Sequence, residues 1–172
     1  MTVSIRPIQE EEKDAVWQMF QDIPAKENNT ENQAHGMNHD EFDEFCKKNV
    51  LYTRKENLPE GRIPQIIYII SDDDVPVGFG KFRPFLNEEC IKKKISQFAY
   101  MISPKYRNKG YATQFLSFLK EEASVFGLKE IMVGVLKENT ISRHIIEKSG
   151  GVLKECAEER AIYTIALQDK SR

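Results

Sequence analysis

The feature that most constrains how this 172-residue chain can fold is a strand, a cationic turn and a helix in direct succession. Residues 95–102 combine aromatic and β-branched side chains and end just before a proline, as expected of a β-strand. From Ala112 to Phe126 the apolar side chains recur every three or four residues, which predicts one buried face of a helix of about four turns. Gly127 supplies a stop signal for that helix. The chain must therefore turn sharply at residues 103–111.

This turn has the composition of an anion site. Lys105, Arg107 and Lys109 place three positive charges within five residues, and Gly110 stands at the start of the helix. The first turn of a helix has unpaired N–H groups and a partial positive charge. A glycine there lets a phosphate approach the backbone without meeting a Cβ. A solvated basic loop before an ordinary helix explains the same residues equally simply.

Two motifs carry a resemblance to a known family. The pattern Arg107-x-x-Gly110-x-Ala112 resembles the Gln/Arg-x-x-Gly-x-Gly/Ala signature of the GCN5-related N-acetyltransferase (GNAT) superfamily. Residues 139–151 are similar to the family's Asn-x-x-Ala-x-x-Leu-Tyr-x-x-x-Gly-Phe segment, at the expected separation. The pairing of the two motifs looks closest to a bacterial subgroup of predicted acetyltransferases, and the resemblance covers essentially the whole chain.

The resemblance implies an α/β (α+β) fold with a central mixed, mostly antiparallel sheet. This sheet splays between its fourth and fifth strands and is flanked by about four helices. Side-chain patterns place the strands at 3–8, 65–71, 75–83, 95–102, 130–136, 152–156 and 160–167. They place the helices at 9–21, from Asn38 onward, at 112–126 and at 139–148. The segments 24–36, 54–64 and 84–94 are predicted to be loops.

Composition bounds the class of protein. Hydrophobic residues at 40% and charged residues at 30% are typical of a globular protein, and the length predicts one domain over residues 1–172. The chain shows no signal peptide or membrane-spanning run, so we expect a cytoplasmic location. A net charge of −2 gives no case for nucleic-acid binding. The three cysteines are scattered, and the acidic triplet 72–74 lacks the other ligands of a calcium loop, so no metal site is expected.

The resemblance also implies acetyl-coenzyme A as cofactor, with coenzyme A as product, lying in the opening of the sheet. Backbone groups of residues 100–102 would pair with the pantetheine arm, and the amides of the turn, with one hydroxyl, would hold the pyrophosphate. The residues implied for cofactor binding are Tyr100, Met101, Ile102, Arg107, Asn108, Lys109, Gly110, Tyr111, Ala112, Thr113, Asn139 and Ser142. Asn139 is also a good helix N-cap in its own right.

The implied reaction is direct attack of a primary amine on the thioester in a ternary complex. Such an enzyme must hold the two reactants together, polarise the carbonyl and move protons. Many family members protonate the leaving thiolate with a tyrosine, but the matching position here is Ile146, which has no proton to give. The catalytic residues therefore stay unassigned. Side chains that could act as a general base are Tyr100, Glu88, Glu89 and Tyr163.

The acceptor, an amine of a small molecule or a peptide, is not identified by the sequence. Residues 23–64 and 84–94 would bound its site. Acidic side chains in the first of these segments would attract a cationic amine, but a solvated acidic helix face explains them more simply; they are Glu27, Glu31, Asp40, Glu41, Asp43 and Glu44. Because of Ile146, an acyl-coenzyme A-binding sensor without transferase activity is the alternative. A nucleotide-binding protein is a third reading, weakened by the lack of a glycine-rich phosphate motif. A homodimer through the final strands and the transfer of another short acyl group also stay open.

Overall fold

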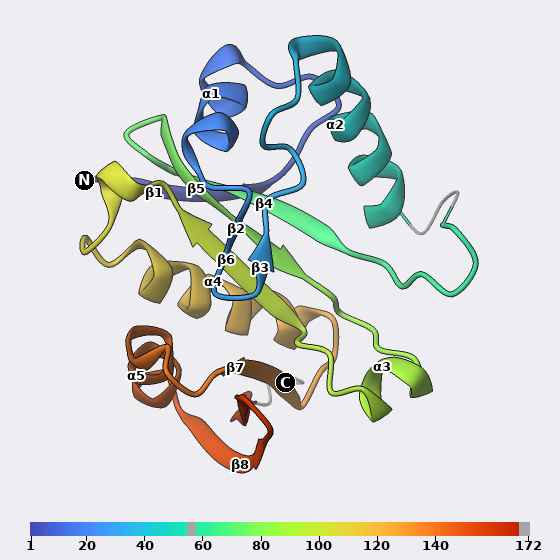
Figure 1. Cartoon of the computed structure of the whole chain (residues 1–172), viewed down its shortest axis with the longest axis vertical. Helices are drawn as coiled ribbons and strands as arrows, with labels where there is room; N and C mark the ends of the chain where they lie inside the picture. The colour runs from blue at the N-terminus through green and yellow to red at the C-terminus, as the bar shows by residue number, and fades with distance from the viewer. Residues whose placement is uncertain (55–57, 169–172) are drawn as a thin grey trace.

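The computed structural model describes residues 1–54 and 58–168 and contains two antiparallel sheets with helices packed on their faces (Figure 1). The larger sheet has the order β1 (Val3–Pro7), β4 (Ile66–Asp72), β5 (Val75–Phe82) and β6 (Phe98–Ile102). The smaller sheet has the order β7 (Glu130–Leu136), β9 (Arg160–Ala166) and β8 (Gly151–Ala157). The expected fold class, with its division between the strand ending near residue 102 and the strand at 130–136, is confirmed.

Four helices cover the two sheets. Helices α1 (Asp14–Asp22) and α2 (His39–Thr53) lie on one face of the larger sheet, and α4 (Tyr111–Val125) lies on the other (Figure 1). Helix α5 (Thr140–Lys148) packs beside the smaller sheet. One apolar core fills the space under α1 and α2. A second runs continuously from the larger sheet, beneath α4, into the smaller sheet, so that α4 holds the two sheets together.

The helix starts follow from local hydrogen bonding. Helix α2 begins after Asn38, whose side chain accepts a hydrogen bond from the Glu41 N–H at 2.9 Å, as the capping pattern predicted. Helix α1 begins five residues later than the predicted start at residue 9. The reason is that the Glu12 carboxylate binds the Arg6 guanidinium at 2.7 and 2.8 Å and also accepts the Gln9 N–H at 2.8 Å. These bonds hold the segment in a turn.

Two short elements lie where loops were predicted. A hairpin of β2 (Lys26–Glu27) and β3 (Thr30–Glu31) turns through Asn28 and Asn29, whose φ angles are 49° and 64°. Asparagine tolerates this left-handed conformation, which two-residue hairpin turns require. Helix α3 (Glu88–Lys92) is a single capped turn. Neither element is long enough to show a hydrophobic period.

The two sheets are joined at one end and open at the other. At the start of β6 the Gln97 N–H donates to the Met132 carbonyl at 2.9 Å, and the Gln97 side chain accepts the Met132 N–H at 2.9 Å. The Ser96 hydroxyl bonds to both backbone groups of Gly134, at 2.8 and 3.0 Å. Residues 95–97 therefore form this joint, and β6 begins at Phe98 instead of at the predicted residue 95. Beyond it, β6 and β7 share no ladder among the described residues, and an opening results.

The described residues contain neither a membrane-spanning helix nor a metal-binding cluster. None of the helices within residues 1–54 and 58–168 combines the length and the apolar character needed to cross a bilayer. Within those ranges no cluster of three or more His, Cys, Asp or Glu side chains stands close enough to ligate a metal ion.

Gly80 permits the close approach of α4 to the larger sheet. A Cβ built on Gly80 would lie 2.1 Å from Cζ of Phe115, a ring that is fully buried and so has nowhere to move. We therefore expect Gly80→Ala to lower the free energy of unfolding by about 1–3 kcal/mol, measured by urea denaturation. In the double variant with Phe115→Leu the two costs should be less than additive, because the smaller side chain removes the clash. Strict additivity would show that this contact does not limit the packing.

Candidate functional site

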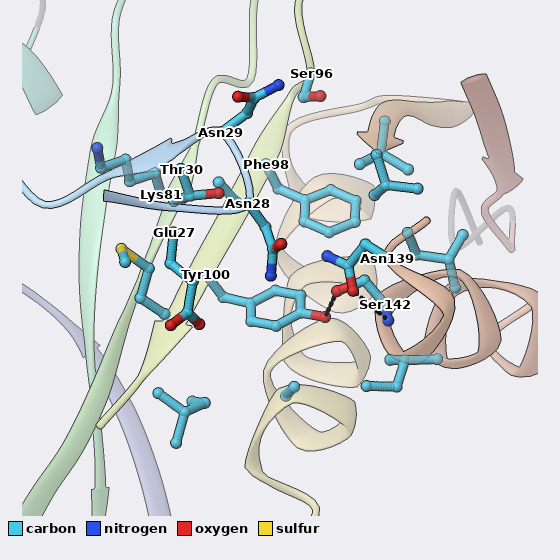
Figure 2. A pocket seen from close by; sticks show the side chains of 18 of the residues that line it. Glu27, Asn28, Asn29, Thr30, Lys81, Ser96, Phe98, Tyr100, Asn139 and Ser142 are labelled. Carbon is cyan, nitrogen blue, oxygen red and sulfur yellow. Dashed lines mark hydrogen bonds between the residues drawn. The ribbon is translucent and has the colours of Figure 1, made fainter. Parts of the chain in front are cut away.

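A cavity of about 730 Å³ occupies the opening between the two sheets (Figure 2). Its walls come from β6, β7, α5, the turn before α4 and the β2–β3 hairpin. The structure brings all twelve residues singled out by sequence to this one cavity: Tyr100, Met101, Ile102, Arg107, Asn108, Lys109, Gly110, Tyr111, Ala112, Thr113, Asn139 and Ser142. They come from three segments of the chain, so the fold alone assembles them.

The register of β6 determines which backbone groups face the cavity. At the two ends of the strand, the Gln97 carbonyl and the Ser103 N–H bond to β5 at 2.7 and 2.8 Å. Residues of an antiparallel pair alternate in this respect. The backbone groups of Met101 therefore bond to β5, whereas those of Tyr100 and Ile102 point into the opening. Along this edge the strand presents both backbone groups of Tyr100 and the N–H of Ile102 to whatever lies between the sheets, whereas the Ile102 carbonyl already accepts a hydrogen bond from the Arg107 Nε at 3.2 Å.

The Tyr100 side chain crosses the cavity towards α5. Its hydroxyl lies 2.9 Å from Oγ of Ser142 (Figure 2). Ser142 is itself fixed by the cap of α5, since its N–H donates to Oδ1 of Asn139 at 3.3 Å. Burial raises the pKa of the Tyr100 hydroxyl, and the hydrogen bond with Ser142 opposes this only in part. The hydroxyl therefore stays protonated at neutral pH, which suits a proton donor better than a base.

The position of the usual tyrosine is confirmed to be apolar. Ile146 is fully buried in the core below the cavity, and its side chain offers no polar atom. Of the side chains considered as bases, Tyr100 alone lines this cavity; Glu88, Glu89 and Tyr163 do not. Tyr163 is instead held in the core, where its hydroxyl donates to the Glu147 carboxylate at 2.5 Å.

The turn before α4 leaves its N–H groups available. Asn108 and Gly110 have φ angles of 62° and 85°, and α4 starts without a side-chain cap. The N–H groups of the first helical turn have no partner within the helix, so they are free to bind an acceptor in the cavity. A Cβ built on Gly110 would find no atom within 4 Å, so the space in front of the turn is open. This is the geometry of an anion site.

Two of the three cations of the turn form ion pairs, whereas the Lys109 ammonium lies 5.7 Å from the centre of the Tyr106 ring. Lys105 forms an ion pair with Asp22 at 3.3 Å, and Arg107 forms one with Glu27 at 2.9 Å. The Arg107 Nε also donates to the Ile102 carbonyl at 3.2 Å. Because Glu27 belongs to β2, this ion pair ties the hairpin to the turn across the mouth of the cavity.

The far end of the cavity contains charged residues that the sequence analysis missed. Lys81 on β5 is only 9% exposed, and its ammonium donates to the Glu31 carbonyl at 2.7 Å. Burial and then the charge of Arg83 lower the pKa of Lys81 to about 8, against the opposing effect of the Glu31 charge. The signal in the sequence was a lysine within the otherwise uncharged strand 75–82. The arginines that line the same end are Arg62, Arg83 and Arg160.

The acidic side chains that suggested a cationic acceptor lie mostly elsewhere. Asp40 and Asp43 line neither this cavity nor the one beside it. Glu41 and Glu44 line the neighbouring cavity, of about 700 Å³, between α2 and the segment around residue 62. Among the residues that the structure describes, only the hairpin, with Glu27 and Glu31, brings carboxylates to the main cavity, so the charged side chains that line it are mostly positive.

Several solved acetyltransferases share this fold. The GNAT-family acetyltransferase from Streptococcus pneumoniae is 16% identical, with a TM-score of 0.63 over 97% of this chain and 100% of that one. RimL, a ribosomal L7/L12 α-N-protein acetyltransferase solved with coenzyme A, is 14% identical, with a TM-score of 0.70 over 99% and 97%. The putative acetyltransferase yncA from Salmonella typhimurium, solved with acetyl-CoA, is 13% identical, with a TM-score of 0.62 over 100% and 98%.

Because the sequence identities to these structures are only 16%, 14% and 13%, the structural similarity shows that the fold is shared. No curated sequence matches the chain significantly. A family model does match: the acetyltransferase (GNAT) domain aligns with residues 2–152, which is most of the chain and includes both the turn and α5. This protein therefore belongs to the GNAT acetyltransferase family.

Proposed function

We propose that this protein is an N-acetyltransferase that transfers the acetyl group of acetyl-coenzyme A to a primary amine of a small molecule or peptide. One observation carries the proposal: a single cavity connects the free edge of β6 to the uncapped start of α4. The edge of β6 suits the amides of an extended chain, and the start of α4 suits a pyrophosphate. Family membership supplies the reaction class, and RimL and yncA were solved with coenzyme A and acetyl-CoA.

Each part of the cavity has a role in this proposal. The N–H groups of the turn, with the Thr113 hydroxyl, bind the pyrophosphate. The backbone groups of Tyr100 and the N–H of Ile102 bind the pantetheine arm as an added strand, while Met101 contributes through packing, because its backbone groups are bonded to β5. Asn139 orders α5 beside the reacting end. Acetyl-coenzyme A is a substrate of the reaction, and in this proposal it lies in the cavity between the two sheets.

In the chemical step the amine nitrogen forms a bond to the thioester carbon, and the bond from that carbon to sulfur breaks. The amine gives up one proton, and the leaving thiolate takes one up. We assign the second transfer to the Tyr100 hydroxyl, which lies next to Ser142 in the cavity and holds its proton at neutral pH. These two hydroxyls take the place of the tyrosine that is absent at Ile146. The group that removes the amine proton is not assigned.

A turnover assay tests the proposed function. We expect free thiol to be released from acetyl-coenzyme A only when a suitable amine is present, and mass spectrometry to show that amine heavier by one acetyl group. The assay should cover amino acids, peptides, polyamines and aromatic amines. Binding of acetyl-coenzyme A without acetylation of any amine would favour an acyl-coenzyme A sensor instead. Preference for ATP or NAD over coenzyme A would overturn both readings.

A further inference from the structure

The end of the cavity opposite the turn is lined by four cationic side chains. We define the basic end of the cavity by these residues, which are Arg62, Lys81, Arg83 and Arg160. It lies where the two sheets join, beside Ser96 and Gly134, whereas the turn before α4 lies at the open end of β6. We propose that the acceptor carries a carboxylate close to its reactive amine and that the basic end binds this carboxylate; this inference rests on the proposed function.

Three of the four cations of the basic end have neutral hydrogen-bond partners. The Lys81 ammonium donates to the Glu31 carbonyl at 2.7 Å, and the Arg83 guanidinium donates to the Ser96 carbonyl at 2.9 Å. The Arg160 guanidinium donates to the Lys94 carbonyl at 2.8 Å. Across residues 1–54 and 58–168, no carboxylate lies within ion-pair distance of any cation of the basic end. Lys81 is buried, Arg83 and Arg160 are partly buried, and Arg62 is exposed. The buried charge of Lys81 is costly without a counter-charge, and an anionic ligand would offset that cost.

The carboxylates of the cavity do not neutralise the basic end. Glu27 is engaged by Arg107 at 2.9 Å, at the other end. Glu31 is exposed and bonds to Lys81 through its backbone carbonyl, so its carboxylate acts on Lys81 only from a distance. The neighbouring cavity adds Glu41 and Glu44 on α2, together with Lys48. The nearby carboxylates therefore do not cancel the charge of the cations at the joint of the sheets. The net positive charge there attracts an anion.

The location separates this anion from the phosphates of the cofactor. In the proposed function the pyrophosphate lies at the turn and the pantetheine arm runs along β6 towards Tyr100. Lys81 lies further along β5, paired with Ala99 on β6, and it contacts the hairpin (Figure 2). Arg83 follows the end of β5, and its backbone N–H donates to the Gln97 carbonyl at 2.7 Å. The basic end thus lies beyond the thioester, on the side left for the acceptor. A carboxylate bound there would hold a nearby amine next to the reacting carbon.

The carboxylate has two possible sources, the α-carboxylate of an amino acid and the side chain of an acidic residue in a peptide. Matched acceptors distinguish them. The first arm compares amino acids of different side chains with their own α-amides. The second compares dipeptide amides that have Asp or Asn after the N-terminal residue. We expect the carboxylate member of a pair to have a kcat/KM at least about tenfold higher than its amide in one arm, which identifies the source. Lys81→Met should lower kcat/KM for the carboxylate member more than for the amide member, and so bring that ratio close to one.

A matched control keeps the test specific. Lys120 on α4 also donates to a backbone carbonyl, that of Ser149 at 3.0 Å, but it does not line the cavity. Lys120→Met should leave the preference for the carboxylate unchanged. A preference for amides or polyamines, a preference that survives Lys81→Met, or no turnover of any pair despite binding of acetyl-coenzyme A would each overturn the inference. Failure to bind acetyl-coenzyme A would overturn the proposed function, and this inference with it.

Discussion

Gly110→Asp is expected to abolish the binding of acetyl-coenzyme A, whereas Gly110→Asn is expected to retain most of it. The two side chains have nearly the same shape, and both tolerate the left-handed conformation that Gly110 adopts at φ 85° better than other residues. A Cβ at this position meets no atom within 4 Å, so neither variant should clash with the protein. The carboxylate of the aspartate, however, would bind the free N–H groups of α4 and repel a phosphate.

A thermal-shift titration measures this difference. Ligand at about 100 times its dissociation constant stabilises a protein by roughly 2.7 kcal/mol, which is about 5–10 °C for a chain of this size. We expect that shift for the wild type, most of it for Gly110→Asn, and a dissociation constant at least about 100-fold higher for Gly110→Asp. Gly127→Asp places the same charge at the other end of α4, also at a positive φ and in open space, and should bind normally. Equal binding by both Gly110 variants would contradict an anion site at the turn.

Tyr100→Phe is expected to lower kcat by about 100-fold while changing the affinity for acetyl-coenzyme A little. A positioned general acid typically contributes a factor of about 10²–10⁴. The substitution removes only the hydroxyl, so the ring keeps its packing on Phe115, with the centroids 6.4 Å apart. Ser142→Ala should lower kcat in the same direction. The double variant should cost little more than Tyr100→Phe alone, because the two hydroxyls act as one hydrogen-bonded pair.

Steady-state kinetics with thiol detection checks this prediction once an acceptor is known. Tyr68→Phe is the matched control, because it removes the hydroxyl of another buried tyrosine, one that bonds to Glu122 at 3.0 Å and does not line the cavity. It should leave kcat unchanged. A Tyr100→Phe variant with wild-type kcat would show that the thiolate takes its proton from water. A variant with raised KM and unchanged kcat would give Tyr100 a binding role only.

Much of the architecture was predictable because it depends on local patterns. The apolar period of α4, the glycines at 110 and 127 and the N-cap at Asn38 each act within a few residues, and the structure follows them closely. The strand at 130–136 was predicted with its observed bounds. The start of α1 was predicted too early because the bond between Glu12 and Arg6 competes with the helix, and a contact of this kind leaves no periodic signal.

The candidate site was predictable only in part. Its backbone component follows from motifs, but which residues of β6 face the cavity depends on the pairing with β5, and only the structure gives that register. The basic end is built from separate strands and a loop, and its charges look like ordinary surface charges in the sequence. The ion pair of Arg107 with Glu27 joins residues 80 positions apart, so no local pattern could have shown it.

The open edge of β6 has a mechanical consequence. The chain bonds its two sheets together on one side of the opening, at Gln97 and Met132, and leaves the other side unpaired. An extended ligand that bonds to β6 and touches α5 becomes a fifth strand of the larger sheet and a brace against the smaller one. In the proposed complex, the substrate thus links the two sheets on the side where the chain leaves them unpaired. The two halves of the protein become more rigid around the bond that is about to break.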